Sequence, residues 1–213
     1  MKIIFNNVIP IPLKEESLTH SQVWDKSISL TNEESYFLSS NSGKGKSTFL
    51  NFLYGLRKDY QGTITIDEKD ISLFTLQDWS VLRKEKIAYL PQNLELINHL
   101  SVWDNLLLKN ELTNHYSETE IKNFLNQFNL IDHIEKPINQ LSIGQQQRVA
   151  LIRTLLQPFN TLLLDEPFSH LDEENITIGL KLINEACKKE NANYIIATLG
   201  YSYGVESNKL LLL

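Results

Sequence analysis

The chain has 213 residues, of which 42% are hydrophobic and 22% are charged, so its composition disfavours global disorder and a fibrous architecture. Its formal net charge of −6 at pH 7 argues against a protein that mainly coats nucleic acid. A chain of this length can bury a core without disulfides or metals, and we expect one compact domain, or a core with a small attached lobe.

The sequence predicts neither a secretion signal nor a membrane span. The N-terminal residues become polar too early for a signal peptide, and no apolar run approaches the roughly 18 residues that a span needs. The single cysteine, Cys187, forbids an internal disulfide and is expected to be a packed thiol, while the scattered histidines disfavour a zinc site. We therefore expect a soluble, cytoplasmic chain.

Short strand-like runs alternate with segments of helix length, which is typical of an α/β protein with a parallel sheet. In chain order we expect strands over 28–30 and 36–39, a helix over 47–54, and strands over 63–67 and 87–90. Apolar residues at helical spacing between 102 and 134 then predict an inserted helical lobe. The core resumes with helices over about 142–157 and 173–189, and with strands over 162–164, 194–198 and 209–213.

A loop rich in small residues lies between the second expected strand and the first expected helix. It reads Ser40, Asn41, Ser42, Gly43, Lys44, Gly45, Lys46, Ser47 and Thr48. Small residues let successive backbone N–H groups surround phosphate oxygens, while Lys46 would reach the β- and γ-phosphates and the Ser47 hydroxyl would face Mg²⁺. Although Ser40 stands where the usual phosphate-loop motif has glycine, the order of the other parts favours a phosphate site over a chance Gly- and Ser-rich loop.

Two acids follow the buried strand at 162–164. The carboxyl ends of parallel strands are the edge at which such sheets bind ligands, so Asp165 and Glu166 are expected beside the phosphate loop. Asp165 would belong to the Mg²⁺ shell, and Glu166 could accept a proton from an attacking water. The alternative, an acidic cap on the next helix, does not explain the phosphate loop.

A third motif, Leu-Ser-Ile-Gly-Gln-Gln-Gln-Arg at 141–148, opens the helix of the resumed core, with Ser142 as a natural N-cap. Here the chain resembles the nucleotide-binding subunit of ATP-binding cassette (ABC) transporters, whose signature is Leu-Ser-Gly-Gly-Gln. Ile143 is the one departure within those five residues. The resemblance runs from about Ser27 to the last residue.

The resemblance implies a RecA-like P-loop NTPase core with an antiparallel β-lobe and an inserted helical lobe, all within a single domain over 1–213. The core would span about 1–92 and 141–213, and the helical lobe about 93–140. The cofactors would be ATP and Mg²⁺. Two copies, or one copy and a related cassette, would pair head to tail, with each nucleotide between residues 40–48 of one copy and Ser142, Gly144 and Gln145 of the other.

By the same resemblance, Ser47, Gln92 and Asp165 would organise Mg²⁺, and the catalytic residues would be Lys46, Gln92 and Glu166. The partner would be an integral membrane permease, which would hold the chain at the inner face of the cell membrane. The segments 83–92 and 94–105 resemble the lipoprotein-releasing and macrolide-export type of subunit, although import, division-associated and lipid-transport subunits share much of the pattern.

Besides Ser40 and Ile143, other positions depart from the family's pattern or leave a role open. The family has a histidine that contacts the γ-phosphate after the strand at 194–198, where this sequence has Leu199 and Gly200. The segment Ser-His-Leu-Asp at 169–172 has His170 where the family's interface loop has alanine, and we expect this side chain to face solvent or the interface. His20 and Trp24 are both candidates to stack on adenine, although Trp24 could instead belong to the core.

Two other functions are compatible with parts of the sequence. A nucleotide-gated scaffold with slow or no hydrolysis would fit Ser40 and Leu199, but it has no need of Glu166. A family member that acts on DNA or ribosomes is disfavoured by the acidic charge, so we expect no nucleic-acid partner.

Overall fold

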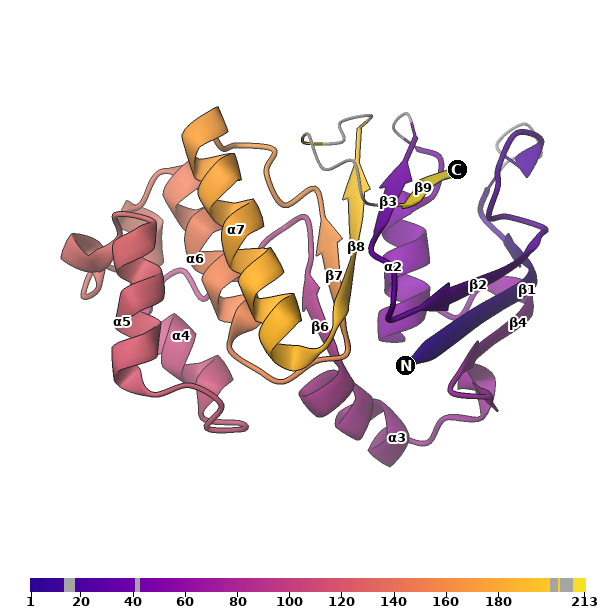
Figure 1. Cartoon of the computed structure of the whole chain (residues 1–213), viewed down its shortest axis with the longest axis horizontal. Coiled ribbons are helices and arrows are strands. Elements are labelled where there is room, and N and C mark those ends of the chain that lie inside the picture. The colour runs from indigo at the N-terminus through magenta and orange to yellow at the C-terminus, as the bar shows by residue number, and fades with distance from the viewer. Residues whose placement is uncertain (14–17, 41–42, 200–202, 204–208) are drawn as a thin grey trace.

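The structure, a computed structural model, describes residues 1–13, 18–40, 43–199, 203 and 209–213. Within these residues the strands form one antiparallel and one parallel sheet (Figure 1). The antiparallel sheet has the order β2-β1-β4-β5, with bounds Ser27–Thr31, Lys2–Pro10, Tyr60–Ile66 and Lys69–Asp70. The parallel sheet has the order β6-β7-β8-β3-β9, with bounds Ile87–Leu90, Thr161–Asp165, Asn193–Thr198, Tyr36–Ser39 and Lys209–Leu212.

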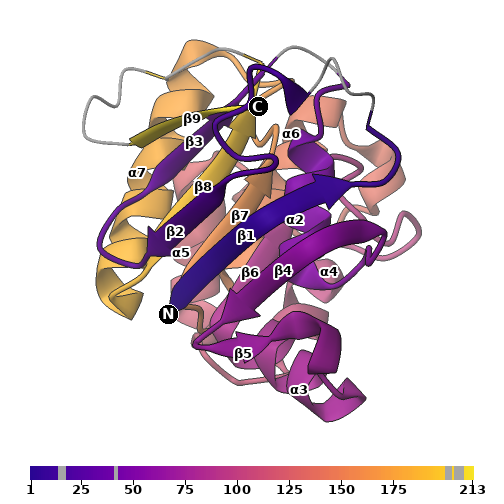
Figure 2. The same cartoon turned by 90° about the vertical axis from the view of Figure 1, so that its right-hand side faces the viewer.

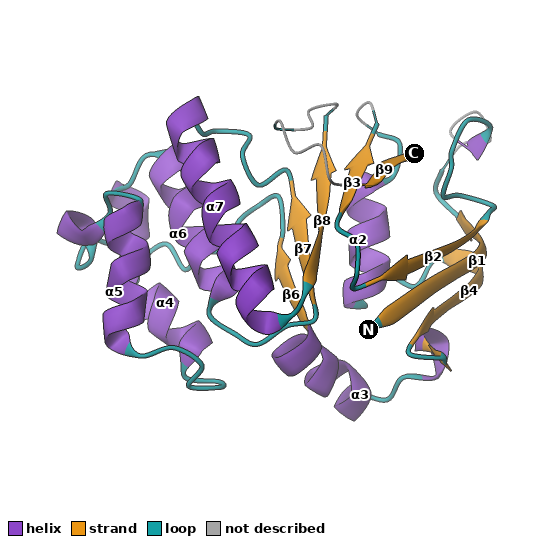
Figure 3. Cartoon of the chain, viewed as in Figure 1, coloured by secondary structure: helices purple, strands orange, loops and turns teal. Residues whose placement is uncertain are grey.

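The helices cover both faces of the parallel sheet (Figures 1 and 2). Helix α2 (Lys46–Tyr54) lies between the two sheets, whereas α6 (Ile143–Leu155) and α7 (Glu173–Glu190) lie on the other face, coloured purple in Figure 3. Three further α-helices lie within the described residues: α3 (Leu76–Val81), which continues as a π-helical turn over Leu82–Lys86, α4 (Val102–Asn110) and α5 (Glu118–Gln127). No helix in the part of the chain described here is both long and apolar enough to cross a membrane.

The alternation of strand side chains divides the core into two clusters. On β7, Leu163 packs with the cluster around α2 and the antiparallel sheet, while Leu162 and Leu164 pack with the cluster around α4 to α7. All three are fully buried, because a parallel strand covered by helices on both faces has no solvent face. This double burial explains the uninterrupted apolar run of the sequence.

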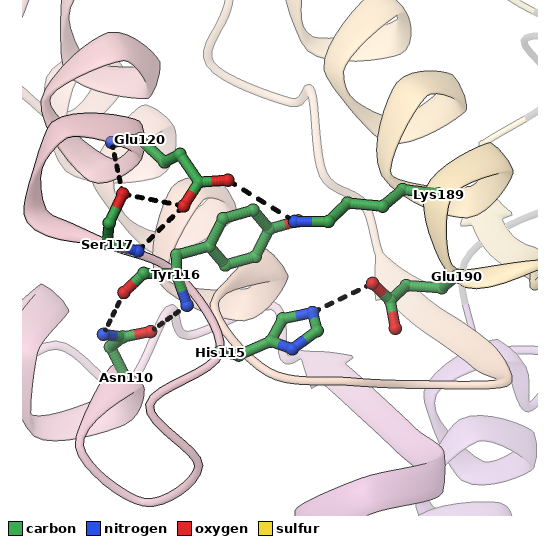
Figure 4. A network of polar contacts seen from close by, with 7 residues as sticks. All are labelled: Asn110, His115, Tyr116, Ser117, Glu120, Lys189 and Glu190. Atoms are coloured by element: carbon green, nitrogen blue, oxygen red, sulfur yellow. Dashed lines mark hydrogen bonds and ion pairs between the residues drawn. The ribbon is translucent and has the colours of Figure 1, made fainter.

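The loop between α4 and α5 is attached to the end of α7 by a polar network (Figure 4). The Asn110 side chain donates to the carbonyl of Tyr116 at 2.8 Å and accepts from its amide at 3.0 Å. His115 Nε2 lies 2.9 Å from Glu190 Oε1, and Lys189 Nζ lies 3.8 Å from the centre of the Tyr116 ring. The network therefore joins the expected helical lobe to a helix of the core.

The expected α/β fold, with its parallel and antiparallel sheets, is confirmed. The sequence pattern does not predict β1, because Asn6 and Asn7 interrupt its apolar alternation. A change of register against β4 falls between Asn6 and Ile9, and Asn7 has φ 50°. Glycine is required opposite this bulge: Gly62 has φ 89°, and a Cβ there would lie 2.2 Å from the Asn7 carbonyl oxygen.

Helix α3 is also absent from the sequence-based expectation, because six residues give too few turns for a helical period. Its N-terminus nonetheless carries a local signal, since Thr75 and Asp78 form a capping box. On α7, the expected packed thiol is found: Cys187 is buried, and burial raises its pKa to about 12.

Candidate functional site

The phosphate loop joins β3 to α2 at the carboxyl edge of the parallel sheet. Gly43 and Gly45 have φ 81° and 98°, a region in which residues with a Cβ are strained. Gly45 is also closely covered, because a Cβ there would lie 2.9 Å from Leu13 Cδ1. Asn41 and Ser42, which were expected in this loop, lie outside the described residues, whereas Lys44 lies between the two glycines and Thr48 lies in the first turn of α2.

Lys46 is the first residue of α2 and points back into the loop. Its ammonium group donates to the carbonyl oxygen of Ser40 at 2.8 Å, and the residue is only 6% exposed. Burial lowers the Lys46 pKa, while the negative charges of Glu166 and Asp165 oppose that shift. The lysine therefore lies within electrostatic reach of both acids at the end of β7.

Asp165 ends β7 and is 3% exposed, and burial raises the pKa of its carboxyl group. A hydrogen bond with the Ser47 side chain opposes this shift. Within the described residues, Asp165 Oδ1 is buried without a hydrogen-bond partner. A buried carboxylate oxygen without a partner is unfavourable. Mg²⁺ prefers oxygen ligands such as carboxylates and hydroxyls, so the pair formed by Asp165 and Ser47 fits this ion.

Glu166 follows directly and has φ 50°, an uncommon conformation for a residue with a Cβ. Its amide donates to the carbonyl of Ala197 on β8 at 3.0 Å, and its Oε2 accepts from Gln92 Nε2 at 3.3 Å. Gln92 follows β6, which pairs with β7 in parallel, so both side chains leave the same sheet edge. The structure thus brings Lys46, Asp165, Glu166 and Gln92 together.

The motif at 141–148 begins α6, on the opposite face of the parallel sheet from α2 (Figure 1). Ser142 caps the helix: its hydroxyl accepts from the Gln145 amide at 3.2 Å, and the Gln145 side chain accepts from the Ser142 amide at 2.9 Å. Ile143 is half-exposed. Gly144 lies against another loop, because a Cβ there would be 2.9 Å from the carbonyl oxygen of His170.

Gln147 is a site residue that the sequence reasoning missed. It is 2% exposed, and its Nε2 donates to the Glu166 carbonyl at 3.0 Å and to Ser169 Oγ at 3.1 Å. Its Oε1 accepts from the His170 amide at 2.9 Å. The available signal is helical spacing, since Gln147 is a polar residue one turn before the buried Leu151. Gln147 thereby connects α6 to the segment 166–170.

Of the two candidates for stacking on adenine, Trp24 is a core residue. It is fully buried among the rings of Phe5, Phe49 and Phe52, and its Nε1 donates to the carbonyl of Lys44 at 3.2 Å. Trp24 thus supports the phosphate loop from behind and has no free face for a base. His20 is exposed and remains the candidate.

A cavity of about 710 Å³ opens beside Glu166. Its lining includes Glu166, Ser169, Thr198, Leu199 and Tyr203. Leu199, at the position where a histidine is missing, is 51% exposed, and Gly200 lies outside the described residues. The Thr198 hydroxyl donates to Tyr203 Oη at 3.3 Å.

Comparisons with known proteins agree with this geometry. The sequence pattern described as "ABC transporter" matches residues 24–169. The lipoprotein-releasing system ATP-binding protein LolD of Buchnera aphidicola is 31% identical over 188 residues, which cover 87% of this chain and 82% of that protein. The ABC transporter ATP-binding protein YtrE of Bacillus subtilis is 29% identical over 177 residues, which cover 82% of this chain and 77% of that protein.

Solved structures show the same fold. A putative ABC transporter ATP-binding protein from Pyrococcus furiosus superposes with a TM-score of 0.77 at 23% identity, covering 99% of this chain and 98% of that chain. An ATP-binding cassette solved as a dimer in a post-hydrolysis state with ADP and phosphate gives 0.73 at 26% identity, covering 93% of this chain and 88% of that chain. The chain therefore belongs to the ABC transporter family, as one of its ATP-binding, ATP-hydrolysing subunits.

Proposed function

We propose that this chain hydrolyses Mg²⁺-bound ATP as a head-to-tail pair and drives a separate membrane permease, which holds it at the inner face of the cell membrane. The observation that carries the proposal is the meeting of Lys46, Asp165, Glu166 and Gln92 at one edge of the parallel sheet. A lysine, a buried carboxylate with one oxygen that lacks a hydrogen-bond partner among the described residues, and a second carboxylate held by an amide are the groups that phosphate binding and proton transfer require.

Each residue has a proposed role. The loop amides around Gly43 to Thr48 and the Lys46 ammonium bind the phosphates, and Ser47, Asp165 and Gln92 would hold Mg²⁺. When bound, the ion neutralises charge that develops on the phosphates. Gln92 orients Glu166, and Glu166 takes one proton from the attacking water. The water oxygen forms a bond to the γ-phosphorus as the bond between that phosphorus and the bridging oxygen breaks. The electron pair of the broken bond stays on the bridging oxygen, which leaves as part of ADP.

Dimerisation completes the site, because Ser142, Gly144 and Gln145 lie on α6, across the sheet from α2. We propose that these residues cover a nucleotide held by the second copy. The solved dimer of a related cassette with ADP and phosphate supports this arrangement.

We further propose a permease of the lipoprotein-releasing or macrolide-export type. The similarity to the protein named LolD and the segments 83–92 and 94–105 support this assignment. An open cavity of about 490 Å³ between α3 and α4, lined among others by Trp79, Arg83 and Lys109, is a suitable docking surface for the permease. Its exposed apolar residues Leu76 and Leu112 would contact the permease.

Phosphate release by the purified chain, alone and with its permease, tests the proposal. The control is Glu166→Gln, which retains the side chain's size and removes its basic carboxylate. We expect turnover of the native chain that is lost in the control, while both bind ATP. Equal rates would refute ATP-driven transport and favour the nucleotide-gated scaffold. Leu76→Glu should abolish copurification with the permease while the basal rate stays unchanged.

A further inference from the structure

The chain lacks a histidine at position 199, after β8, but has one at position 170, on the loop after β7. At Leu199, after β8, the chain has an apolar side chain where a histidine is expected. His170 lies on the loop after β7, only four residues beyond Glu166, and its side chain is exposed. The function proposed above does not use His170.

The backbone of His170 is held by a hydrogen bond to the buried side chain of Gln147. This side chain accepts from the His170 amide at 2.9 Å and donates to the Glu166 carbonyl at 3.0 Å. Glu166 and His170 are thus held by one side chain of α6. The imidazole therefore extends from a loop whose backbone is anchored beside Glu166.

The hydrogen bonds around Ser169 are compatible with a tautomer of His170 that carries its proton on Nε2. Gln147 Nε2 donates to Ser169 Oγ at 3.1 Å, and Ser169 Oγ lies 2.9 Å from His170 Nδ1. Because the amide supplies the hydrogen in the first contact, the Ser169 hydroxyl can donate its own hydrogen to Nδ1. In a neutral imidazole whose Nδ1 accepts, Nε2 carries the proton. No hydrogen-bond partner of Nε2 occurs among the residues described, so Nε2–H is available as a donor.

His170 belongs to the same surface as the signature motif. Its carbonyl oxygen would lie 2.9 Å from a Cβ at Gly144, so this loop packs closely against the start of α6. Any molecule that covers Ser142 and Gly144 therefore also meets the segment that carries the imidazole. In the head-to-tail pair proposed above, that molecule is the nucleotide held by the second copy.

We propose that His170 donates a hydrogen bond from Nε2 to the phosphates of the ATP held by the partner copy, and so supplies in trans the imidazole that Leu199 does not supply in cis. Ser169 and Gln147 are positioning residues that fix the tautomer and the loop. This inference rests on the proposed head-to-tail dimer, since His170 reaches that nucleotide only across the interface.

A mixing experiment tests the assignment in trans. Glu166→Gln and His170→Ala are purified separately. His170→Ala should release phosphate about 100-fold more slowly than the native chain, the typical effect of losing a transition-state donor. Glu166→Gln should be slower still, because it loses the base that accepts the proton of the attacking water. In the mixed dimer, the His170→Ala copy keeps its own Glu166 and receives His170 from the Glu166→Gln copy. We therefore expect the mixture to exceed the sum of the two separate rates.

A mixture no faster than that sum would overturn the proposal, as would a native rate in His170→Ala alone. His99→Ala, which changes an exposed loop histidine, is the matched control and should keep the native rate. ATP-dependent dimerisation of Glu166→Gln, measured by size-exclusion chromatography, separates the two levels of inference. If no dimer forms, the proposed function fails; if a dimer forms without complementation, only the role of His170 fails.

Ser169 provides a second test that does not depend on mixing. Ser169→Ala should lower kcat about tenfold, measured where the variant is fully folded, and leave the KM for ATP unchanged, because it removes the group that fixes the tautomer. It also removes the acceptor of one Gln147 hydrogen bond, so the melting temperature should fall slightly. Ser169→Thr keeps the hydroxyl and should restore kcat. A purely structural role would lower the melting temperature and leave kcat of the folded variant unchanged, and that result would contradict the relay.

Discussion

The buried side chain of Gln147 gives the sharpest test of how α6 controls the catalytic edge. Gln147→Met keeps the length of the side chain and removes all its hydrogen bonds: two that it donates, to Glu166 and Ser169, and one that it accepts from His170. Each hydrogen bond contributes about 1 kcal/mol net, so we expect the free energy of unfolding to fall by about 3 kcal/mol.

The loss of activity should exceed what the loss of stability explains. Glu166 adopts φ 50°, and holding a residue with a Cβ in this region costs about 1–3 kcal/mol. Without the bond from Gln147 to its carbonyl, Glu166 can relax toward negative φ, which moves its carboxylate away from the site. Phosphate release should therefore fall about 100-fold. ATP affinity should be retained, because Lys46 and the loop amides remain in place.

Urea unfolding followed by circular dichroism, together with phosphate release under conditions where the variant is fully folded, measures both effects. Gln127→Met is the matched control, because Gln127 is an exposed residue of α5 and its replacement should change stability by less than about 0.5 kcal/mol. If Gln147→Met kept the native rate in its folded state, Gln147 would not position Glu166.

Three further changes test other parts of the structure. Asp165→Asn should raise the free energy of unfolding of the nucleotide-free chain at pH 7. The Asp165 pKa is raised by burial, so its carboxylate destabilises the fold above the unfolded pKa, and the stabilisation by Asp165→Asn should shrink as the pH falls toward 4. A variant less stable than the native chain at pH 7 would contradict an unfavourable buried carboxylate. Gly62→Ala should lower the free energy of unfolding by about 2 kcal/mol or more, because its Cβ would lie 2.2 Å from the Asn7 carbonyl oxygen. An unchanged urea midpoint would show that the backbone of the bulge moves to make room for the Cβ. Lys46→Ala should abolish ATP retention in equilibrium dialysis, whereas tight binding would refute our placement of the phosphate loop.

The elements that carry the site were predictable because their signals are local. The strand β3 runs directly into a loop of small residues, and β7 is an apolar run that ends in two acids, so neither prediction requires knowledge of the tertiary structure. The strand β1 was missed because a bulge at Asn7 breaks its alternation, and that bulge is compensated by Gly62 on another strand. Such a pair is recognisable only once the two strands are seen together.

Within the site, the sequence located Lys46, Asp165 and Glu166 but not what holds them. The role of Gln147 depends on which loop packs over α6, and the positive φ of Glu166 depends on bonds to β8 and α6. The burial of Trp24 likewise follows from three aromatic neighbours on separate elements. These are long-range contacts, so residue type and spacing do not reveal them.

The burial of Cys187 has a practical consequence for site-specific labelling of this protein. A thiol whose pKa is raised to about 12 is almost entirely protonated at neutral pH, and only the thiolate reacts readily with maleimides. A cysteine placed at an exposed position, such as Gln127→Cys, would therefore be the preferred site of labelling in the natural background. Two such labels, one on each copy, would report by their separation how the pair closes on ATP and opens after hydrolysis.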